Sequence, residues 1–393
     1  MERPDSSLRT VPFLRVGLND LPTVWAMSPT PSSPLSRDPR IDFFRGLALI
    51  WIFLNHIPEN ALSWLSNRNY GFSDATEIFV FLSGYSAAMA YRKKLTSSWW
   101  EGATACWARA GDLYVAHLWM TAGLIAMLVL FLLFRVPHAE GFVRLANLSQ
   151  VIAPLSLTTL AEVALLKLKL LNMDVLPLYI VLMLMLPFML RGLTRNAGAT
   201  LVASVGVWLL AQEGLVFKGW VFNPFGWQLL FVCGAALALN PVWRKTILNA
   251  NKTVVTGCSG LILAWSALVA LSWQGVVAYE VPPSLASWIY PISKPNLDIL
   301  RLAHFFALAG VVAFWLPAES RLWHGSVARF LETLGRKSLR VFCVGILLSF
   351  LGHVALLKLP ATLGAQMGIS LIGILLLYTA ANGYSAKKQR AAH

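Results

Sequence analysis

Ten apolar runs, most of them close to the length needed to cross a lipid bilayer, constrain this chain more than any other feature of its sequence. A helix needs about 20 apolar residues to span the hydrocarbon core. The 393 residues are 57% hydrophobic and 13% charged, which is far from the balance of ordinary soluble domains. We therefore predict an all-α helix bundle with ten transmembrane helices at residues 41–57, 75–91, 112–134, 174–190, 198–216, 225–240, 254–273, 297–316, 338–357 and 363–382.

The composition changes sharply outside these runs. Residues 1–40 are rich in Pro and Ser and lack the continuous apolar core of a cleavable signal, which predicts a disordered cytoplasmic tail. Residues 41–383 form the predicted membrane domain, and residues 384–393 form a basic cytoplasmic tail. The amphipathic segment 144–170 contains Pro154 and is expected to lie at the interface or fold against the bundle.

Loop charges provide an independent test of this topology. With ten spans and both termini in the cytoplasm, 22 Lys and Arg residues fall in cytoplasmic segments and eight fall outside, as the positive-inside rule requires. The net charge of +14 is then a property of the loops, and nucleic acid is not an expected partner. Arg45 and Arg301 are the two remaining cations, and both lie inside apolar runs.

The first apolar run, RGLALIWIFLNH, has Arg45 at its start and His56 at its end. Ionisable groups inside a span cost about 2.5–3.5 kcal/mol each on insertion scales, so they mark candidate functional sites. Eleven residues make about three helical turns, which places both side chains on one face about 16 Å apart along the axis. Asp42 lies beside Arg45 on the same helix. We therefore predict that this face is turned towards the bundle interior or water rather than towards lipid.

The predicted topology sorts the other polar residues into two groups. One group lies in the periplasmic half with His56: Asp74, Glu77, Asp174, Tyr179, Lys294, Asn296, Asp298, Arg301 and His304. The other lies near the cytoplasmic surface: Arg45, Arg92, Arg109, Tyr114, His117, Arg336 and Arg340. Cations dominate the second group, which suits the binding of phosphate groups.

Structural roles compete with functional ones at several of these positions. The Asp42–Arg45 and Asp298–Arg301 spacings are equally consistent with ion pairs that fix helix packing. Arg92 is typical of a positive-inside anchor. Three histidines, namely His117, His304 and His353, are typical of hydrogen bonds between neighbouring helices.

The motif FVFLSGY favours close helix packing through Ser83 and Gly84. No two of the four cysteines are spaced as a CxxC pair, and the seven histidines are not spaced as metal ligands. We expect neither a disulfide framework nor a metal site, and no permanently bound cofactor.

Six blocks of the chain, in order, resemble the OpgC-type proteins, which are membrane succinyltransferases of osmoregulated periplasmic glucans in the transmembrane acyltransferase (acyltransferase-3-like) superfamily. The blocks are RDPRIDFFRGLALIWIFLNHIPEN, GFSDATEIFVFLSGY, LPLYIVLMLMLP, NPFGWQLLFVCGA, SKPNLDILRLAHFFALA and LGRKSLRVFCVGILLSFLGH. The resemblance runs from about Arg37 to at least residue 355. Arg45 and His56 match the arginine and histidine of the superfamily's first span.

The resemblance implies acyl transfer across the bacterial inner membrane by a multi-pass enzyme. An acyl-CoA, expected to be succinyl-CoA, is the donor, and a hydroxyl of a periplasmic glucan or other glycan is the acceptor. His56 matches the histidine thought to act as catalytic base, and Arg45 matches its partner arginine, a candidate CoA contact. A homodimer is compatible with the sequence.

Depth and chemistry suggest roles for the remaining residues. A carboxylate that orients His56 is expected to be Asp298, Asp74 or Glu77, and Arg301, Asn296 or Lys294 is expected to stabilise the oxyanion or hold a succinyl carboxylate. The wider set of substrate-binding candidates comprises His304, Asp174, Tyr179, Arg92, Arg109, Tyr114 and His117. Direct transfer is the simplest mechanism, and acylation of a Cys or Ser, Ser83 included, stays open.

A secondary transporter or proton-coupled carrier is the alternative function, because intramembrane His, Asp and Arg residues also form proton relays. The absence of an evident inverted repeat in the sequence argues against it. A structural scaffold would explain the packing motifs without explaining why charges converge on one side.

Overall fold

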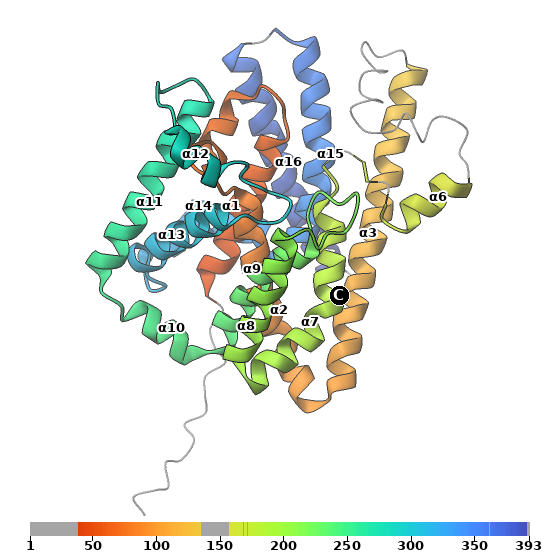
Figure 1. Ribbon diagram of the computed structural model, residues 1–393. Coiled ribbons are helices and arrows are strands. Elements are labelled where there is room, and N and C mark those ends of the chain that lie inside the picture. Colours follow the sequence, from red (N-terminus) through yellow and green to blue (C-terminus); the bar gives the residue numbers. More distant parts are fainter. Residues whose placement is uncertain (1–37, 135–156, 168, 171, 361, 391–393) are drawn as a thin grey trace, which may run out of the picture. The chain divides into compact units, whose positions relative to one another are not determined.

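Helices form all of the regular secondary structure in the residues that the computed structural model describes, which are 38–134, 157–167, 169–170, 172–360 and 362–390 (Figure 1). The predicted disordered tail, up to residue 37, and the part of segment 144–170 that contains Pro154 lie outside them. The α-helices are α1 (Pro39–Asn55), α2 (Ala75–Ser97), α3 (Trp99–Leu133), α6 (Leu157–Ala164), α7 (Val175–Arg195), α8 (Ala197–Gln212), α9 (Pro224–Leu239), α10 (Pro241–Leu248), α11 (Lys252–Trp273), α12 (Pro283–Ile289), α13 (Ile299–Trp315), α14 (Ser326–Arg336), α15 (Ser338–Lys358) and α16 (Leu363–Arg390). Short 3₁₀ helices are η1 (Ala61–Leu65), η2 (Asn67–Tyr70) and η3 (Arg321–His324).

Each of the ten apolar runs coincides with one of these helices, namely α1, α2, α3, α7, α8, α9, α11, α13, α15 and α16. Within the described residues, five helices are long and apolar enough to cross a membrane: α3, α7, α11, α15 and α16 up to Gly383. The pair α9 and α10 makes a sixth if its two bent halves form one span. The part of the chain that the structure describes is therefore all-helical, with five or six candidate membrane spans, while ten crossings and two cytoplasmic termini stay predictions.

The outer helices expose large apolar side chains. Val202 on α8 and Leu261 on α11 are each 74% exposed, and Trp119 on α3 is 75% exposed. A water-soluble fold would bury a surface of this kind, whereas lipid solvates it. The exposed faces thus support the assignment to a membrane.

The bend between α9 and α10 follows from the sequence Asn240-Pro241. Pro241 cannot continue the hydrogen-bond ladder of α9, and Asn240 caps α10 by accepting a hydrogen bond from the backbone N–H of Trp243 (3.2 Å). The two helices consequently meet at 95°.

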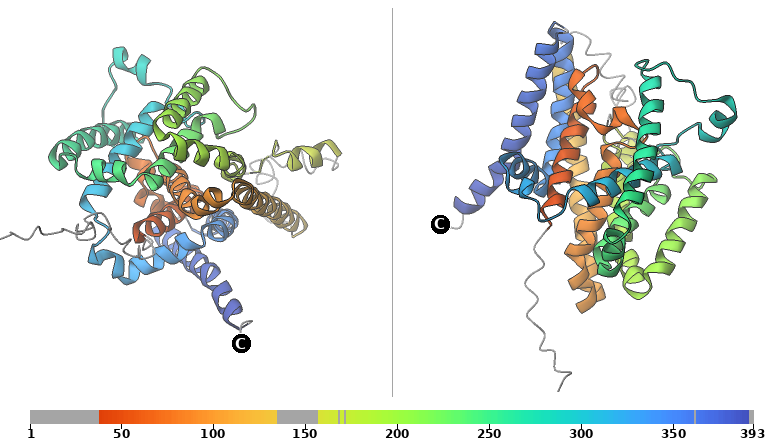
Figure 2. Two further views of the ribbon diagram at one scale, coloured as in Figure 1. Left: turned by 90° about the horizontal axis from the view of Figure 1, so that it is seen from below. Right: turned by 90° about the vertical axis from the view of Figure 1, so that its left-hand side faces the viewer.

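Helices α2 and α9 pack along each other inside the bundle, as Figure 2 shows from two further directions. A Cβ atom added at Gly84 on α2 would lie 2.0 Å from the carbonyl oxygen of Phe231 on α9. One added at Gly234 on α9 would lie 2.1 Å from the carbonyl oxygen of Phe81 on α2. The expectation that Gly84 permits close helix packing is confirmed.

Substituting Gly84 by Ala is expected to destabilise the protein, because the new methyl group meets backbone that cannot move aside. Overpacking of this kind costs about 1–3 kcal/mol. Thermal unfolding of the purified protein in detergent measures the effect. Gly206→Ala is the matched control, because nothing lies within 4 Å of the Cβ position at Gly206 on α8. Equal stability of the two variants would contradict the prediction.

Candidate functional site

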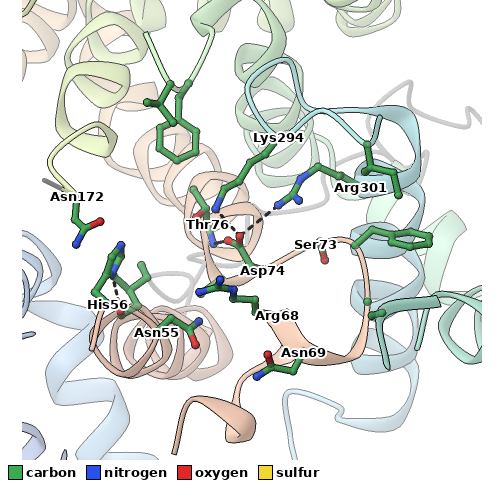
Figure 3. Close-up of a pocket in the computed structure, with 18 of the residues that line it drawn as sticks. Asn55, His56, Arg68, Asn69, Ser73, Asp74, Thr76, Asn172, Lys294 and Arg301 are labelled. Atoms are coloured by element: carbon green, nitrogen blue, oxygen red, sulfur yellow. Dashed lines mark hydrogen bonds and ion pairs between the residues drawn. The ribbon is translucent and has the colours of Figure 1, made fainter. Parts of the chain in front are cut away.

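A cavity of about 1120 Å³ lies where the end of α1 meets the start of α2 (Figure 3). Its wall also includes the residues before α7, the end of α11, the segment 290–294 and parts of α13 and α15. Five of the predicted site residues line it: His56, Asp74, Asp174, Lys294 and Arg301. The structure therefore brings together residues that are more than 200 positions apart in the chain.

His56 lies in the turn after α1 and faces this cavity. Its Nδ1 is 2.6 Å from the carbonyl oxygen of Ile52. A carbonyl oxygen can only accept a hydrogen bond, so Nδ1 carries the proton of the neutral ring. Nε2 is then the unprotonated nitrogen, which is the state that a general base requires.

Four charged side chains form a network at the start of α2. The Lys294 Nζ atom is 2.5 Å from Asp74 Oδ2, and Arg301 Nη2 is 3.3 Å from the same oxygen. Arg301 also donates to Glu77 Oε1 through Nη2 (2.6 Å) and Nε (2.7 Å). Glu77 is fully buried and Arg301 is 8% exposed. The two acidic and two basic side chains give the network no formal net charge, and pairing of opposite charges is what makes buried charges tolerable.

The same acids also cap α2. Asp74 accepts a hydrogen bond from the backbone N–H of Thr76 (2.8 Å), and Glu77 accepts one from the backbone N–H of Asp74 (2.8 Å). This reciprocal arrangement is a capping box. Burial alone would raise the pKa of the Asp74 carboxyl, but Lys294 and Arg301 outweigh it and hold that pKa well below its usual range. Lys294 and Arg301 therefore favour the ionised form of Asp74.

None of the three acids predicted to orient His56 is hydrogen-bonded to it in the described structure. Asp74 and Glu77 bind Lys294 and Arg301, while Asp298 caps α13 by accepting from the backbone N–H of Leu300 (2.8 Å). The ring is oriented instead by the carbonyl group of Ile52. The alternative ion pair between Asp298 and Arg301 is likewise wrong, because Arg301 pairs with Asp74 and Glu77.

Three other residues of the periplasmic group lie outside the cavity wall. The Asn296 side chain accepts a hydrogen bond from Asn223 (3.1 Å), and the Tyr179 hydroxyl donates to the carbonyl oxygen of Phe79 (3.0 Å). His304 on α13 is 2% exposed and contacts Ser73. Asn296 and Tyr179 thus hold the scaffold together in this structure.

Asp174 lies just before α7, near Lys169. The Lys169 ammonium donates to the carbonyl oxygen of Gly219 (2.9 Å) and lies 4.5 Å from the centre of the Trp220 ring. Burial lowers the pKa of Lys169, and Asp174 partly offsets that effect. The Lys169 contacts attach the segment before α7 to the loop before α9.

At the other end of α1, Arg45 does not line the cavity. It forms an ion pair with Asp42 (3.8 Å), donates to the hydroxyl of Ser338, and lies 6.0 Å from the centre of the Phe79 ring. The Asp42 carboxylate also contacts Arg336 (3.6 Å). The expected Asp42–Arg45 pair is therefore present, within a cluster that joins α1, α14 and α15.

The other members of the cytoplasmic group do not converge on Arg45. Arg92 lines a separate small cavity of about 60 Å³ with Arg191, and Arg109 pairs with Asp112 (3.3 Å). The Tyr114 hydroxyl donates to the carbonyl oxygen of Ala164 (2.9 Å), which attaches α6 to α3. His117 is fully buried, and its ring nitrogens have no hydrogen-bond partner among the described residues. The remaining residue, Arg340, donates to the carbonyl oxygen of Ala380 (3.3 Å).

Several residues of the cavity wall were missed from the sequence. Arg68, Asn69, Ser73, Asn172 and His353 all line the cavity. Arg68 reads as an ordinary loop charge, and Ser73 reads as part of the turn before a helix cap. Asn172 has a φ of 60°, a left-handed conformation that Asn tolerates better than most residues, and that preference is the only signal at this position.

Residues 37–389 match the family described as OpgC protein, which covers nearly the whole chain. Neither the search of curated proteins nor the search of solved structures returned a match.

Proposed function

Because the chain belongs to the OpgC family, we propose that it moves a succinyl group from succinyl-CoA, supplied from the cytoplasm, to a hydroxyl of a periplasmic glucan. Family membership itself points to an OpgC-like acyltransferase in a membrane and favours acyl transfer over the carrier. The proposal also makes His56 the general base and places the protein in the bacterial inner membrane.

The observation that carries the proposal is the state of His56 on the wall of a large cavity. Its Nδ1 proton is held by Ile52, which leaves Nε2 to accept a proton from the attacking hydroxyl. A sugar hydroxyl is a poor nucleophile at neutral pH, and removal of its proton during attack contributes roughly 10²–10⁴-fold to the rate. The cavity has room for a sugar ring and an acyl group together.

Cations on the cavity wall suit an anionic acyl group and the oxyanion that forms during transfer. Lys294 and Arg301 are partly neutralised by Asp74 and Glu77. Arg68 is different, because it is exposed on the wall and no ion pair or hydrogen bond joins its side chain to another described residue. Its guanidinium group lies beneath Asp74 in Figure 3, close enough to His56 for an electrostatic interaction. We assign the distal carboxylate of a succinyl group to Arg68.

The test is a transfer assay with purified protein in liposomes, succinyl-CoA on one side and periplasmic glucan on the other. CoA release together with succinylated glucan supports the proposal. The proposal is overturned if well-folded protein consumes no acyl-CoA, or if it moves a solute without releasing CoA.

Replacing Arg68 by Ala is expected to lower kcat/KM for succinyl-CoA while leaving the lower-charge donor acetyl-CoA unaffected. A charged hydrogen bond is worth about 1.5–3 kcal/mol, which corresponds to roughly 10-fold or more in kcat/KM. Steady-state rates with the two donors measure the effect. Lys358→Ala removes an exposed cation that does not line the cavity and serves as the control. An equal loss with both donors would contradict the assignment of the succinyl carboxylate to Arg68.

A further inference from the structure

Ser73 makes two contacts with one nitrogen of His304. Its backbone N–H is 3.3 Å from His304 Nδ1, and its Oγ is 2.6 Å from the same atom. An amide N–H can only donate, so Nδ1 is unprotonated and the Ser73 hydroxyl is the second donor to it. The proton of the neutral ring is then on Nε2. A serine that donates to an unprotonated histidine is the arrangement of an activated nucleophile and its base.

The position of the histidine ring is fixed by the chain just before Ser73. The ring hydrogen-bonds the backbone of Tyr70 and packs against Gly71, where an added Cβ would lie 1.9 Å from Nε2. The Phe72 ring is 6.3 Å away, centre to centre. A base held by a third group completes the usual geometry of a nucleophilic site.

The Ser73 hydroxyl is not needed to hold this loop in place. The carbonyl oxygen of Ser73 accepts from the Asn67 side chain (3.2 Å), and that of Asn69 accepts from Gln274 (2.9 Å). The backbone N–H of Ser73 already occupies His304 Nδ1. A purely structural serine would therefore duplicate contacts that the backbone makes.

Ser73 also lies on the wall of the cavity that His56 lines. Figure 3 shows the two residues on either side of the cluster formed by Asp74, Lys294 and Arg301. The cavity thus has a serine–histidine pair on one part of its wall and an unprotonated histidine nitrogen on another.

We infer that Ser73 is a covalent acyl carrier in the proposed transfer, with His304 as its base. This inference rests on the proposed function and adds a first half-reaction to it. Ser73 Oγ attacks the thioester carbonyl carbon and gives its proton to His304 Nδ1. The carbon–sulfur bond breaks, and His304 returns the proton to the departing CoA thiolate, which leaves as the free thiol.

The second half-reaction releases the acyl group to the acceptor. The acceptor hydroxyl attacks the ester carbonyl and gives its proton to His56 Nε2. The ester bond to Ser73 Oγ breaks, the serine oxygen takes up a proton from solvent, and His56 gives the proton that it accepted back to solvent. The donor and the acceptor, which reach the protein from opposite sides of the membrane, then need not be bound at the same moment.

The test uses succinyl-CoA labelled in its succinyl group, with glucan omitted, and locates the label by mass spectrometry of peptides. The His56→Ala protein is expected to accumulate label on the peptide that contains Ser73, and Ser73→Ala is expected to show none. Ser349→Ala is the matched control, because Ser349 is a buried serine that bonds within its own helix to Ile346 (2.8 Å). It should be labelled and active like the unaltered protein.

Ser73→Cys guards against a variant that merely misfolds. It retains a nucleophile, so its label should be a thioester that neutral hydroxylamine removes readily, whereas the serine ester should resist. Label that persists in Ser73→Ala, or unimpaired transfer to glucan by that variant, would overturn the inference. The inference would also be overturned if the unaltered protein succinylated glucan but the His56→Ala protein carried no label. That result would leave the proposed function intact. If the unaltered protein neither releases CoA nor modifies glucan, the proposed function fails and this inference fails with it.

Discussion

Replacing His56 by Ala is expected to reduce acyl transfer to the acceptor by roughly 10²–10⁴-fold, the usual contribution of a general base. The methyl side chain of alanine cannot accept the proton of the attacking hydroxyl. Among the described residues, His56 is the one whose ring is held by the Ile52 carbonyl group on the cavity wall, so the substitution leaves no equivalent nitrogen there. Donor binding should persist, because the substitution removes neither Arg68 nor Lys294.

Rates of glucan acylation, together with equilibrium binding of acyl-CoA, separate these effects. His56→Gln tests the geometry, because a glutamine amide can donate to the Ile52 carbonyl group but is not a base. It should be as inactive as the alanine variant. His324→Ala removes an exposed histidine on η3 and should be fully active. Transfer by His56→Ala at more than about a tenth of the original rate would remove His56 from the mechanism.

Replacing Arg301 by Met is expected to lower the free energy of unfolding by about 3–5 kcal/mol, because it leaves a buried carboxylate without its cation. Glu77 is fully buried, and Arg301 makes both of the short contacts between Glu77 and a basic side chain. The double variant Glu77→Met/Arg301→Met should recover most of that loss, because it removes both charges. Unfolding of the purified protein in mixed detergent and denaturant measures the three stabilities.

Lys294→Met is the comparison for this prediction, since the Lys294 side chain is 38% exposed and solvent screens its pair with Asp74. Its loss should cost less than that of Arg301. If Arg301→Met were no less stable than Lys294→Met, the network would not stabilise the fold in the way described.

The sign of the pH effect follows from Asp74. Its pKa is depressed in the folded protein, so its contribution to stability is complete above the pKa of an unfolded aspartate, about 3.9. That contribution is lost as the pH falls through the folded-state value. Neutral and mildly acidic solutions should therefore leave the contribution of Asp74 to stability unchanged.

Much of the helical framework was predictable, because an apolar run in a membrane protein leaves the backbone little choice other than a helix. The convergence of His56, Asp74, Lys294 and Arg301 was also predictable from topology, which gives each residue a depth. Depth does not give the direction in which a side chain points around its helix axis. For that reason Asp298 and Asn296, at the same predicted depth, turned out to bind backbone and scaffold groups instead of lining the cavity.

The cytoplasmic group shows the same limitation more strongly. Arg45, Arg92 and Arg109 share a predicted depth, yet they lie in different contacts on different helices. Ser73 was missed for another reason, because a serine before a helix start reads as a turn residue. Its contact is with His304, which is 231 positions away in the sequence.

The anchoring of the imidazole by the last turn of its own helix has a consequence for how related enzymes diversify. The carbonyl group of Ile52 accepts from both the backbone amide (3.1 Å) and the ring of His56, so the imidazole is positioned within a single pentapeptide. Remodelling of the more distant segments of the cavity wall is therefore expected to leave the alignment of the ring intact. Under the proposed function, the preference for a glycan acceptor can change, by natural selection or in directed evolution, while the position of the His56 ring stays the same.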